Sequence, residues 1–356
     1  MKALILAAGK GNRLKPLTHT QAKHLLPVAN KPILFYILEQ IRQTGIDDIG
    51  IVISPDTGPQ LQQAVGNGSC WGAKVSYILQ PQPLGLAHAV KVSRDYLGDS
   101  PFLMFLGDNL IQGGVTTFVE QFNRSRPDAL VLLKKMPNPQ AFGVAQLDNN
   151  NCIVGIEEKP KQPKSDLVVV GIYLFSPAIH RAIEQIKPSA RGELEITDSI
   201  HKLIDSGGQV LSQVLEGWWL DTGSRDDLLE ANRIMLEEFA SRRILGRLDS
   251  RSSALGHVEI GEGTVVENSE IRGPATIAGN CVIRNSFIGP FTSIGANTII
   301  EDSSVERCVI LGDCRICLFQ PLANSVIGQG AKLSRAAAMN TRGIRLFVGD
   351  DASLDL

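Results

Sequence analysis

The sequence predicts an α/β protein in two parts, a doubly wound sheet with helices on both faces and then a three-sided β-solenoid. As far as about residue 239, short apolar runs alternate with helical patterns, which is typical of a mainly parallel sheet covered by helices. Beyond about residue 257, aliphatic residues instead recur every five or six positions. The chain has 356 residues, which exceeds the size at which one hydrophobic core usually stops growing.

The predicted strands of the first part are apolar runs bounded by turn residues. They cover residues 3–8, 49–53, 75–79, 102–106 and 129–133. Between the first two, Lys31 and Pro32 open a helix with one apolar face, and Gly45 closes it. This strand, helix, strand order indicates a Rossmann-like mixed, mainly parallel sheet. A further helical pattern covers residues 224–243.

The second part repeats about every 17 residues and has three sides. Aliphatic residues pair at this interval: Ile260 with Ile277 and Ile294, Val266 with Ile283 and Ile300, Ile271 with Ile288 and Val305, Ile310 with Ile327, and Ile316 with Leu333. Stacked turns would bury these residues along one axis. Glycines at 261, 289, 295, 312 and 328 are expected at the corners, with positive φ. The pattern resembles the hexapeptide-repeat left-handed β-helix, and the handedness follows from that resemblance.

The polar segment 247–253 separates the two parts. We therefore expect a first domain over residues 1–243 and a linker over residues 244–256. The β-helix would cover residues 257–336, and a C-terminal tail would cover residues 337–356.

Composition excludes several classes of protein. A net charge of −2 leaves no broad basic surface for nucleic acid. No apolar run approaches the roughly 20 residues of a membrane helix, and the apolar start is too short for a signal peptide, so we expect a cytoplasmic protein without a membrane partner. The six cysteines are expected to be reduced thiols. Cys314 and Cys317 have the spacing of half a zinc site, but without a second pair they are more simply explained as buried small side chains.

The first predicted strand ends in a glycine-rich, cationic loop. Gly9 and Gly11 would let backbone N–H groups approach a ligand, and Lys10 and Arg13 would supply positive charge, which suits a polyphosphate. Neither the Walker pattern nor the dinucleotide-binding pattern fits, since Leu14 stands where the latter needs a third glycine. An ordinary glycine turn with surface cations is the alternative.

Two aspartates follow predicted apolar runs, at the sheet edge where ligands of doubly wound folds bind. Asp108 follows the strand at residues 102–106, and Asp221 follows residues 218–220. Carboxylates at this edge suit Mg²⁺. Aspartates that end strands are also common turn formers, which is the alternative.

Ordered segments along nearly the whole chain resemble the sugar-nucleotide pyrophosphorylases. They include Gly9-Lys10-Gly11-Asn12-Arg13-Leu14, Lys23-His24-Leu25-Leu26-Pro27-Val28, residues 80–87, Gly107-Asp108-Asn109, Phe142-Gly143-Val144, Glu157-Glu158-Lys159-Pro160, residues 171–173, residues 192–198 and Asp221-Thr222-Gly223. Residues 345–350 resemble the end of the family's long form, which carries a repeat domain. The resemblance implies a Mg²⁺-dependent reaction in which a sugar 1-phosphate oxygen attacks the α-phosphorus in line, pyrophosphate leaves, and no covalent intermediate forms.

The same resemblance implies dTTP and glucose 1-phosphate as substrates, with dTDP-glucose as the product. UTP or another triphosphate and another sugar 1-phosphate are the alternatives, because Ala8 is also usual in relatives that use UTP or GTP. Arg13 would neutralise the departing β- and γ-phosphates, Lys23 would steady the α-phosphate, and Lys159 would hold the sugar phosphate, so these three would be catalytic.

The resemblance also assigns the remaining site residues by position. It implies nucleotide contacts from Leu6, Gly9, Gly11, Gln80 and Gly85. It implies a sugar-phosphate site formed by Gly143, Glu158, Lys159, Val169 and Arg191, and a Mg²⁺ site formed by Asp108 and Asp221.

Two other classes of protein remain as alternatives. One is an acyltransferase seated on the β-helix, against which the absence of histidine between residues 260 and 333 argues. The other is a regulatory subunit that has lost turnover. The β-helix itself is predicted to serve structure and homo-oligomer assembly, so that removing residues after Leu248 should change the oligomeric state more than the chemistry.

Overall fold

The computed structural model describes residues 1–334 and 344–355, and the chain divides into two compact units. The first unit comprises Met1–Gly9 and Leu34–Leu220, and the second comprises Lys10–Ile33 and Asp221–Leu356. The division differs from the predicted boundary at residue 243, because the glycine-rich loop packs with the C-terminal unit. The predicted end of the β-helix at residue 336 and the first residues of the predicted tail lie outside the described residues.

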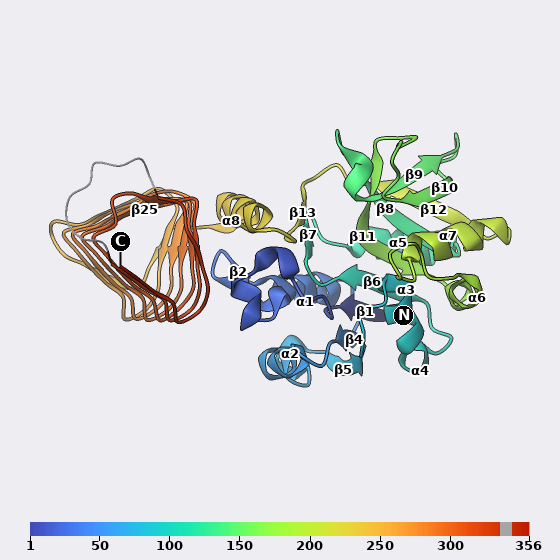
Figure 1. The fold of residues 1–356 in the computed structure, drawn as a ribbon, viewed down its shortest axis with the longest axis horizontal. Helices are drawn as coiled ribbons and strands as arrows, with labels where there is room; N and C mark the ends of the chain where they lie inside the picture. Colours follow the sequence, from blue (N-terminus) through green and yellow to red (C-terminus); the bar gives the residue numbers. More distant parts are fainter. Residues whose placement is uncertain (335–343, 356) are drawn as a thin grey trace. The chain divides into compact units, whose positions relative to one another are not determined.

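The first unit is built on a nine-stranded mixed sheet (Figure 1). All five predicted strands are present, and the order along the sheet is β10-β9-β11-β6-β1-β4-β5, with β8 paired to β11 and β12 paired to β8. β1 is parallel to β4 and β6, whereas β11 is antiparallel to β6, β8 and β9. The strands are β1 (Lys2–Leu6), β4 (Asp48–Ile53), β5 (Lys74–Leu79), β6 (Phe102–Leu106), β8 (Ala129–Lys135), β9 (Gly143–Leu147), β10 (Ile153–Glu158), β11 (Leu167–Phe175) and β12 (Val210–Val214).

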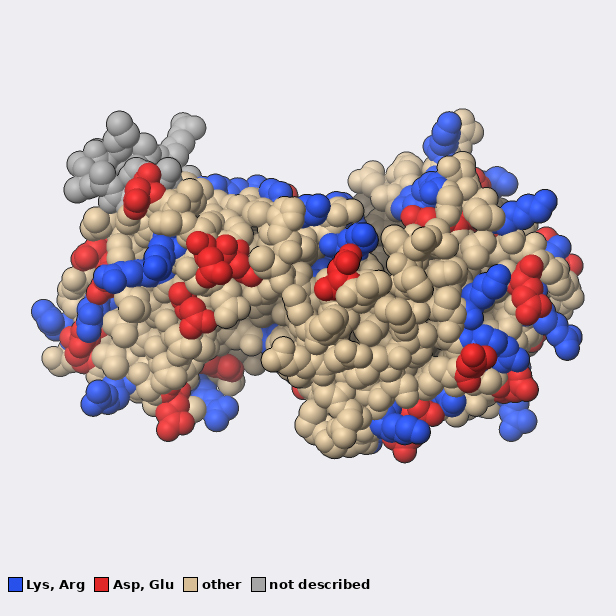
Figure 2. Space-filling view, turned by 60° about the horizontal axis from the view of Figure 1, so that its bottom comes forward, with Lys and Arg blue, Asp and Glu red and all other residues tan. Residues whose placement is uncertain are grey.

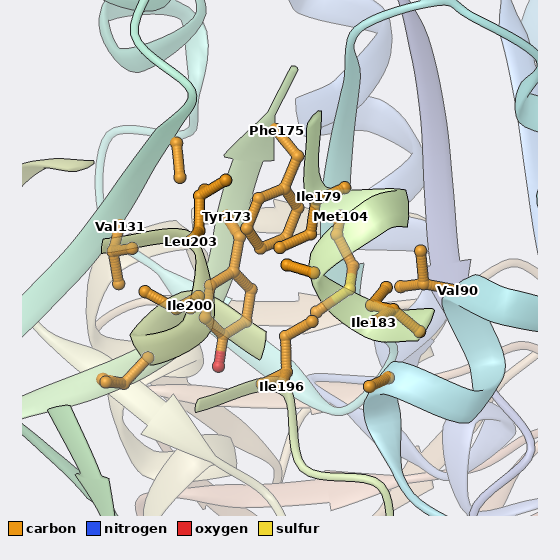
Figure 3. Close-up of a cluster of buried hydrophobic side chains, with 14 of the residues drawn as sticks. Val90, Met104, Val131, Tyr173, Phe175, Ile179, Ile183, Ile196, Ile200 and Leu203 are labelled. Carbon is orange, nitrogen blue, oxygen red and sulfur yellow. The ribbon is translucent and has the colours of Figure 1, made fainter. Parts of the chain in front are cut away.

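Both faces of this sheet are covered, as the sequence predicts. Leu4 and Ile5 point to opposite faces of β1, and both are fully buried. One face packs against α3, α6 and α7, where Tyr173 and Phe175 of β11 meet Ile179, Ile196 and their neighbours (Figure 3). The α-helices among the described residues are α1 (Ile33–Gln43), α2 (Gly58–Val65), α3 (Leu86–Val92), α4 (Arg94–Leu97), α5 (Thr116–Ser125), α6 (Ala178–Gln185), α7 (Ile196–Asp205) and α8 (Arg225–Phe239).

Most of the second unit is a three-sided parallel β-helix, in agreement with the left-handed β-helix expected from the sequence (Figure 1). Every predicted 17-residue partner is a direct neighbour in one of its three sheets; Ile260, for example, lies beside Ile277, and Ile277 beside Ile294. Their side chains form one buried column. The first side consists of β14 (Arg243–Ile244), β17 (Val258–Ile260), β20 (Ala275–Ile277), β23 (Thr292–Ile294), β26 (Val309–Ile310), β29 (Val326–Ile327) and β31 (Phe347–Val348). The second consists of β15 (Arg247–Leu248), β18 (Val265–Glu267), β21 (Val282–Arg284), β24 (Ile299–Glu301), β27 (Arg315–Cys317), β30 (Lys332–Ser334) and β32 (Ser353–Asp355). The third consists of β16 (Ser253–Leu255), β19 (Glu270–Arg272), β22 (Phe287–Ile288), β25 (Ser304–Glu306) and β28 (Leu322–Ala323).

The β-helix is longer than predicted at both ends. Its first coil occupies the predicted linker at residues 244–256. Within the predicted tail, β31 (Phe347–Val348) and β32 (Ser353–Asp355) pair in parallel with β29 (Val326–Ile327) and β30 (Lys332–Ser334). Cys314 is buried in the core of this β-helix.

The reason predicted for the corner glycines, a positive φ, was wrong. None of the five has positive φ; that conformation belongs mainly to Asn and Asp, such as Asn285 and Asp302. Instead, a β-carbon at Gly261 would lie 2.5 Å from the backbone nitrogen of Gly279, and one at Gly295 would lie 2.5 Å from that of Gly312. These glycines are therefore needed because adjacent coils approach each other closely there.

The rest of the second unit is a loop and hairpin that precede α1, together with α8. The loop contains short 3₁₀ turns at Asn12–Leu14, Leu17–His19 and Lys23–Leu25, and the hairpin pairs β2 (Pro27–Val28) with β3 (Lys31–Pro32). The side chain of Ser224 caps α8 by accepting a hydrogen bond from the backbone N–H of Asp227.

Basic and acidic side chains are interspersed over the face shown in Figure 2, in line with the small net charge. Among the described helices, none combines the length and the apolar character needed to cross a bilayer.

Candidate functional site

Leu6 lies at the centre of the carboxyl edge of the sheet. It ends β1 and is flanked by Val52 of β4 and Leu106 of β6. The backbone N–H of Gly107 donates to the Leu6 carbonyl at 2.9 Å. Residues 7–9 and the residues that follow β6 therefore leave the sheet side by side, at the edge where ligands of doubly wound folds bind.

Gln80 and Gly85, predicted to read the base, lie together beyond β5. The buried Gln80 amide donates to the Gly85 carbonyl at 3.2 Å, and its nitrogen lies 3.0 Å from His88 Nδ1. Gly85 has φ of 102°, and a β-carbon there would lie 2.8 Å from the backbone nitrogen of Leu194. Only glycine fits this crossing of two backbone segments.

The five residues predicted for the sugar phosphate all gather around the Glu158 carboxylate. A β-carbon on Gly143 would lie 3.2 Å from Glu158 Oε2 and 3.3 Å from Val169 Cγ2. Lys159 Nζ and Arg191 Nη2 lie 3.8 and 3.4 Å from Glu158 Oε1. The structure thus gives one carboxylate flanked by two cations, beside a glycine where Thr197, Glu158 and Val169 leave no room for a side chain.

Two residues without a predicted role complete this cluster. Glu195 is 5% exposed, and its Oε1 accepts hydrogen bonds from Arg191 Nη2 at 2.8 Å and Nε at 3.2 Å. Thr197, also buried, donates to Glu158 Oε2 at 3.4 Å. Burial raises the pKa of Glu158, and the nearby cations Lys159 and Arg191 offset this only in part.

Asp108 is connected to the sugar cluster by a chain of contacts. Its Oδ1 accepts from Asn109 Nδ2 at 2.9 Å, and Asn109 Oδ1 accepts from Trp219 Nε1 at 2.5 Å. The Trp219 ring lies edge-on to Phe142, with centroids 5.3 Å apart. The Phe142 carbonyl in turn accepts from the backbone N–H of Lys159 at 3.0 Å. Asp108 is therefore held in place, with its carboxylate half-buried.

In the second unit, Gly11 packs against Lys23, one of the two predicted phosphate-binding cations, and precedes the turn that carries the other, Arg13. It has φ of 64°, and a β-carbon there would lie 3.0 Å from Lys23 Cβ. The Gly11 carbonyl accepts from the backbone N–H of Leu14 at 2.9 Å and from Thr18 Oγ1 at 2.7 Å. These bonds close the turn that carries the exposed Arg13.

Arg13 and Asp221 meet at Gly223. A β-carbon on this glycine would collide with the Arg13 guanidinium and would lie 2.9 Å from Asp221 Oδ1. Because Gly223 has no side chain, the Arg13 guanidinium and the Asp221 carboxylate can both lie beside it.

Each of the two predicted metal ligands has the chemistry that suits magnesium. Asp108 and Asp221 supply hard carboxylate oxygens, the ligand type that Mg²⁺ prefers, and Mg²⁺ commonly takes only one or two carboxylates and completes its shell with phosphate and water. Within residues 1–334 and 344–355, no group of three or more His, Cys, Asp or Glu side chains is arranged to hold a metal.

A third residue without a predicted role, Lys134 of β8, fixes the segment that leads to β13 (Trp219–Asp221). Its Nζ donates to the carbonyl oxygens of Leu215, Glu216 and Gly217 at 3.2, 3.1 and 2.6 Å. Because these partners are 81 to 83 residues away in the sequence, no local pattern identifies this lysine. The acidic segment at residues 193–198, by contrast, is part of the quoted family pattern and could have pointed to Glu195.

A doubly wound sheet, a glycine-rich cationic loop and a carboxylate flanked by two more cations are together typical of enzymes that handle phosphorylated substrates. The chain belongs to the nucleotidyl transferase family, whose profile matches residues 2–238.

Individual relatives agree with this membership. The chain is 49% identical to a glucose-1-phosphate thymidylyltransferase from Streptomyces griseus, over 98% of each chain. It is 40% identical, over the whole of both chains, to the low-salt glycan biosynthesis nucleotidyltransferase Agl11 of Haloferax volcanii. A crystal structure from Bacillus anthracis, assigned as a glucose-1-phosphate thymidylyltransferase and complexed with sucrose, matches with a TM-score of 0.62 and 37% identity, covering 66% of this chain and 94% of that one.

Proposed function

We propose that the protein joins dTTP and glucose 1-phosphate to give dTDP-glucose and pyrophosphate. The observation that carries this proposal is the convergence of Gly143, Glu158, Lys159, Val169 and Arg191, which provides a carboxylate for sugar hydroxyls next to two cations for a phosphate. The choice of base and sugar is supported by the full-length relatives that bear this activity in their names.

In this proposal the protein positions two anions and neutralises charge, and it forms no bond to either substrate. An oxygen of the sugar phosphate attacks the α-phosphorus, and the bond from that phosphorus to the bridging oxygen of pyrophosphate breaks. Lys159 and Arg191 hold the attacking phosphate, Lys23 holds the α-phosphate, and Arg13 takes up the negative charge that develops on the departing pyrophosphate.

The remaining predicted residues have binding roles. Gln80 and Gly85 accept the base, and the backbone from Leu6 to Gly11 accepts the nucleotide. Asp108 and Asp221 would hold Mg²⁺, which would supply charge neutralisation for the triphosphate when bound. The cytoplasmic location and the homo-oligomer stay predictions.

The test is pyrophosphate release from glucose 1-phosphate with each of dTTP, UTP, GTP, ATP and CTP, in the presence of Mg²⁺. We expect the highest kcat/KM with dTTP. A higher value with UTP would replace the base assignment and leave the reaction class intact. Absence of release with every triphosphate would overturn the enzymatic proposal and favour the regulatory alternative.

A further inference from the structure

The last described coil of the β-helix contacts the loop that carries Arg13. Asp350 accepts a hydrogen bond from Thr20 Oγ1 on Oδ2 at 2.6 Å, and its Oδ1 accepts from the backbone N–H of Gln329 at 2.8 Å. A β-carbon on Gly349 would lie 3.3 Å from Pro16 Cβ. The segment that directly follows Arg13 is therefore packed and hydrogen-bonded to this coil.

A second connection runs through Phe347. Arg225 donates from Nη2 to the Lys15 carbonyl, two residues after Arg13, and its guanidinium lies over the Phe347 ring, 5.1 Å from the centroid. The Arg345 guanidinium also lies over this ring, at 4.8 Å. Phe347 belongs to β31, which pairs with β29 of the preceding coil. Arg225, which binds the Lys15 carbonyl, is therefore packed against the ordered stack of coils.

The other end of the loop is also fixed to the β-helix. Asn232 of α8 is fully buried, and its Oδ1 accepts from the backbone N–H of Ala29 at 2.8 Å and from Ser293 Oγ at 2.6 Å. Its Nδ2 donates to the Phe291 carbonyl at 3.0 Å. The hairpin tip after Lys23 and the segment after Arg13 are thus both held by the same β-helix.

We propose that the last coil, through Phe347 and Asp350, is a positioning element for Arg13 and sets the affinity of the protein for its triphosphate. This inference rests on the triphosphate role proposed above for Arg13. It departs from the expectation that the β-helix serves assembly more than chemistry, because the contacts connect the coil to a phosphate-binding loop. A cation on an exposed turn binds a phosphate more tightly when it is already held in the binding geometry, and rigid neighbours provide that.

Phe347→Ala and Asp350→Ala in the full chain test the proposal. Phe287→Ala is the matched control, because Phe287 is another β-helix aromatic ring covered by an arginine, Arg272 at 5.5 Å. Phe347→Trp and Asp350→Asn are the conservative variants, which keep a ring and a hydrogen-bonding side chain. The readouts are KM for each substrate, the dTTP dissociation constant without sugar phosphate, Tm, and hydrogen exchange of the amides of His19 and Gln21, which are hydrogen-bonded within the loop.

We expect Phe347→Ala and Asp350→Ala each to raise KM and the dissociation constant for dTTP about three- to tenfold. KM for glucose 1-phosphate should stay within about twofold, and exchange at the two loop amides should become faster. The control and the conservative variants should behave as the wild type.

Unchanged exchange together with unchanged dTTP affinity would overturn the proposal. An equal rise in both KM values, accompanied by a lower Tm, would also overturn it, because that pattern indicates general destabilisation. If the wild-type protein releases no pyrophosphate at all, the proposed function fails, and the exchange rates with the dTTP dissociation constant still decide whether the coil braces the loop.

Discussion

Glu195 holds Arg191 through two hydrogen bonds to a single carboxylate oxygen, from Nη2 at 2.8 Å and from Nε at 3.2 Å. Ser189 Oγ donates to the same oxygen at 2.7 Å. With Glu195 buried, the pair fixes the guanidinium 3.4 Å from Glu158 and so places a second cation beside the sugar cluster. Glu195 acts through Arg191 and is a positioning residue.

Replacing Glu195 with alanine should therefore weaken binding of the sugar phosphate. We expect KM for glucose 1-phosphate to rise about tenfold or more, because hydrogen bonds to charged groups are among the stronger ones, while KM for dTTP stays unchanged. Glu193→Ala is the control, since Glu193 lies 3.8 Å from the same guanidinium and is more exposed. Steady-state kinetics with each substrate varied checks this. Unaltered KM for glucose 1-phosphate would show that Glu195 does not position Arg191.

Glu158 should make stability depend on pH in a defined direction. Burial raises its pKa in the native state above the ordinary 4.5, so the native state holds this proton more tightly than the unfolded state. Its contribution to stability is present below the ordinary value and is lost as pH rises through the raised native value. We expect the Tm of Glu158→Gln to increase relative to that of the wild type as pH rises from the ordinary pKa of 4.5 through the raised native pKa. A Tm difference that is constant or shrinks over the same range would contradict the assignment.

The same titration should affect activity. An ionised carboxylate accepts hydrogen bonds from sugar hydroxyls and a protonated one accepts them less well, so kcat/KM for glucose 1-phosphate should fall as pH is lowered through the raised pKa of Glu158. Glu158→Gln should have a lower kcat/KM without this acidic limb. Persistence of an unchanged acidic limb in the variant would assign it to another group.

Gly223→Ala should displace Arg13 without unfolding the protein. The new methyl group would occupy the space between the guanidinium and Asp221 Oδ1, and misplacing a catalytic group by about 1 Å can cost about 100-fold in rate. We expect kcat/KM for dTTP to fall about 10- to 100-fold. Gly155→Ala is the control, because the three atoms nearest to a β-carbon there all belong to the Gln146 side chain, and the nearest, Nε2 at 3.3 Å, is at its flexible end. Wild-type kinetics in Gly223→Ala would refute the tight arrangement at this glycine.

Asp108→Asn should change the response to magnesium. The amide can still accept the hydrogen bond from Asn109, but one anionic ligand is lost, so kcat should drop about 100-fold and the half-saturating Mg²⁺ concentration should rise. Removal of divalent ions with a chelator should abolish wild-type turnover, and Asp302→Asn on the β-helix should leave it unaffected. A wild-type Mg²⁺ titration curve in Asp108→Asn would exclude this carboxylate as a ligand.

The repeat domain was predictable because its signal is carried by regular spacing. Residues such as Ile277 and Ile294 must face the axis of the β-helix, and the 17-residue interval places each of them beside the equivalent residue of the preceding coil. The role of Gly261 was not predictable, because the constraint there comes from the backbone of the next coil, at Gly279. The antiparallel β11 was missed in the same way, since its partners come from distant parts of the chain.

The candidate site was predictable where its residues lie within family segments, as Gly143, Glu158 and Lys159 do. The supporting hydrogen bonds were not, because they join residues across the fold: Thr197 reaches Glu158 from 39 residues away. The division of the chain into units was also not predictable, because residues 10–33 pack with a C-terminal segment that lies far away in the sequence.

The most direct test of the account is to follow the α-phosphate of dTTP. The protein is incubated with Mg²⁺ and dTTP labelled at the α-phosphorus, with and without glucose 1-phosphate, and the label is located in small molecules and in protein. The account predicts that label appears in dTDP-glucose only when glucose 1-phosphate is present, with one pyrophosphate for each, and that the protein stays unlabelled. Label bound covalently to the protein, or no labelled sugar nucleotide, would contradict it.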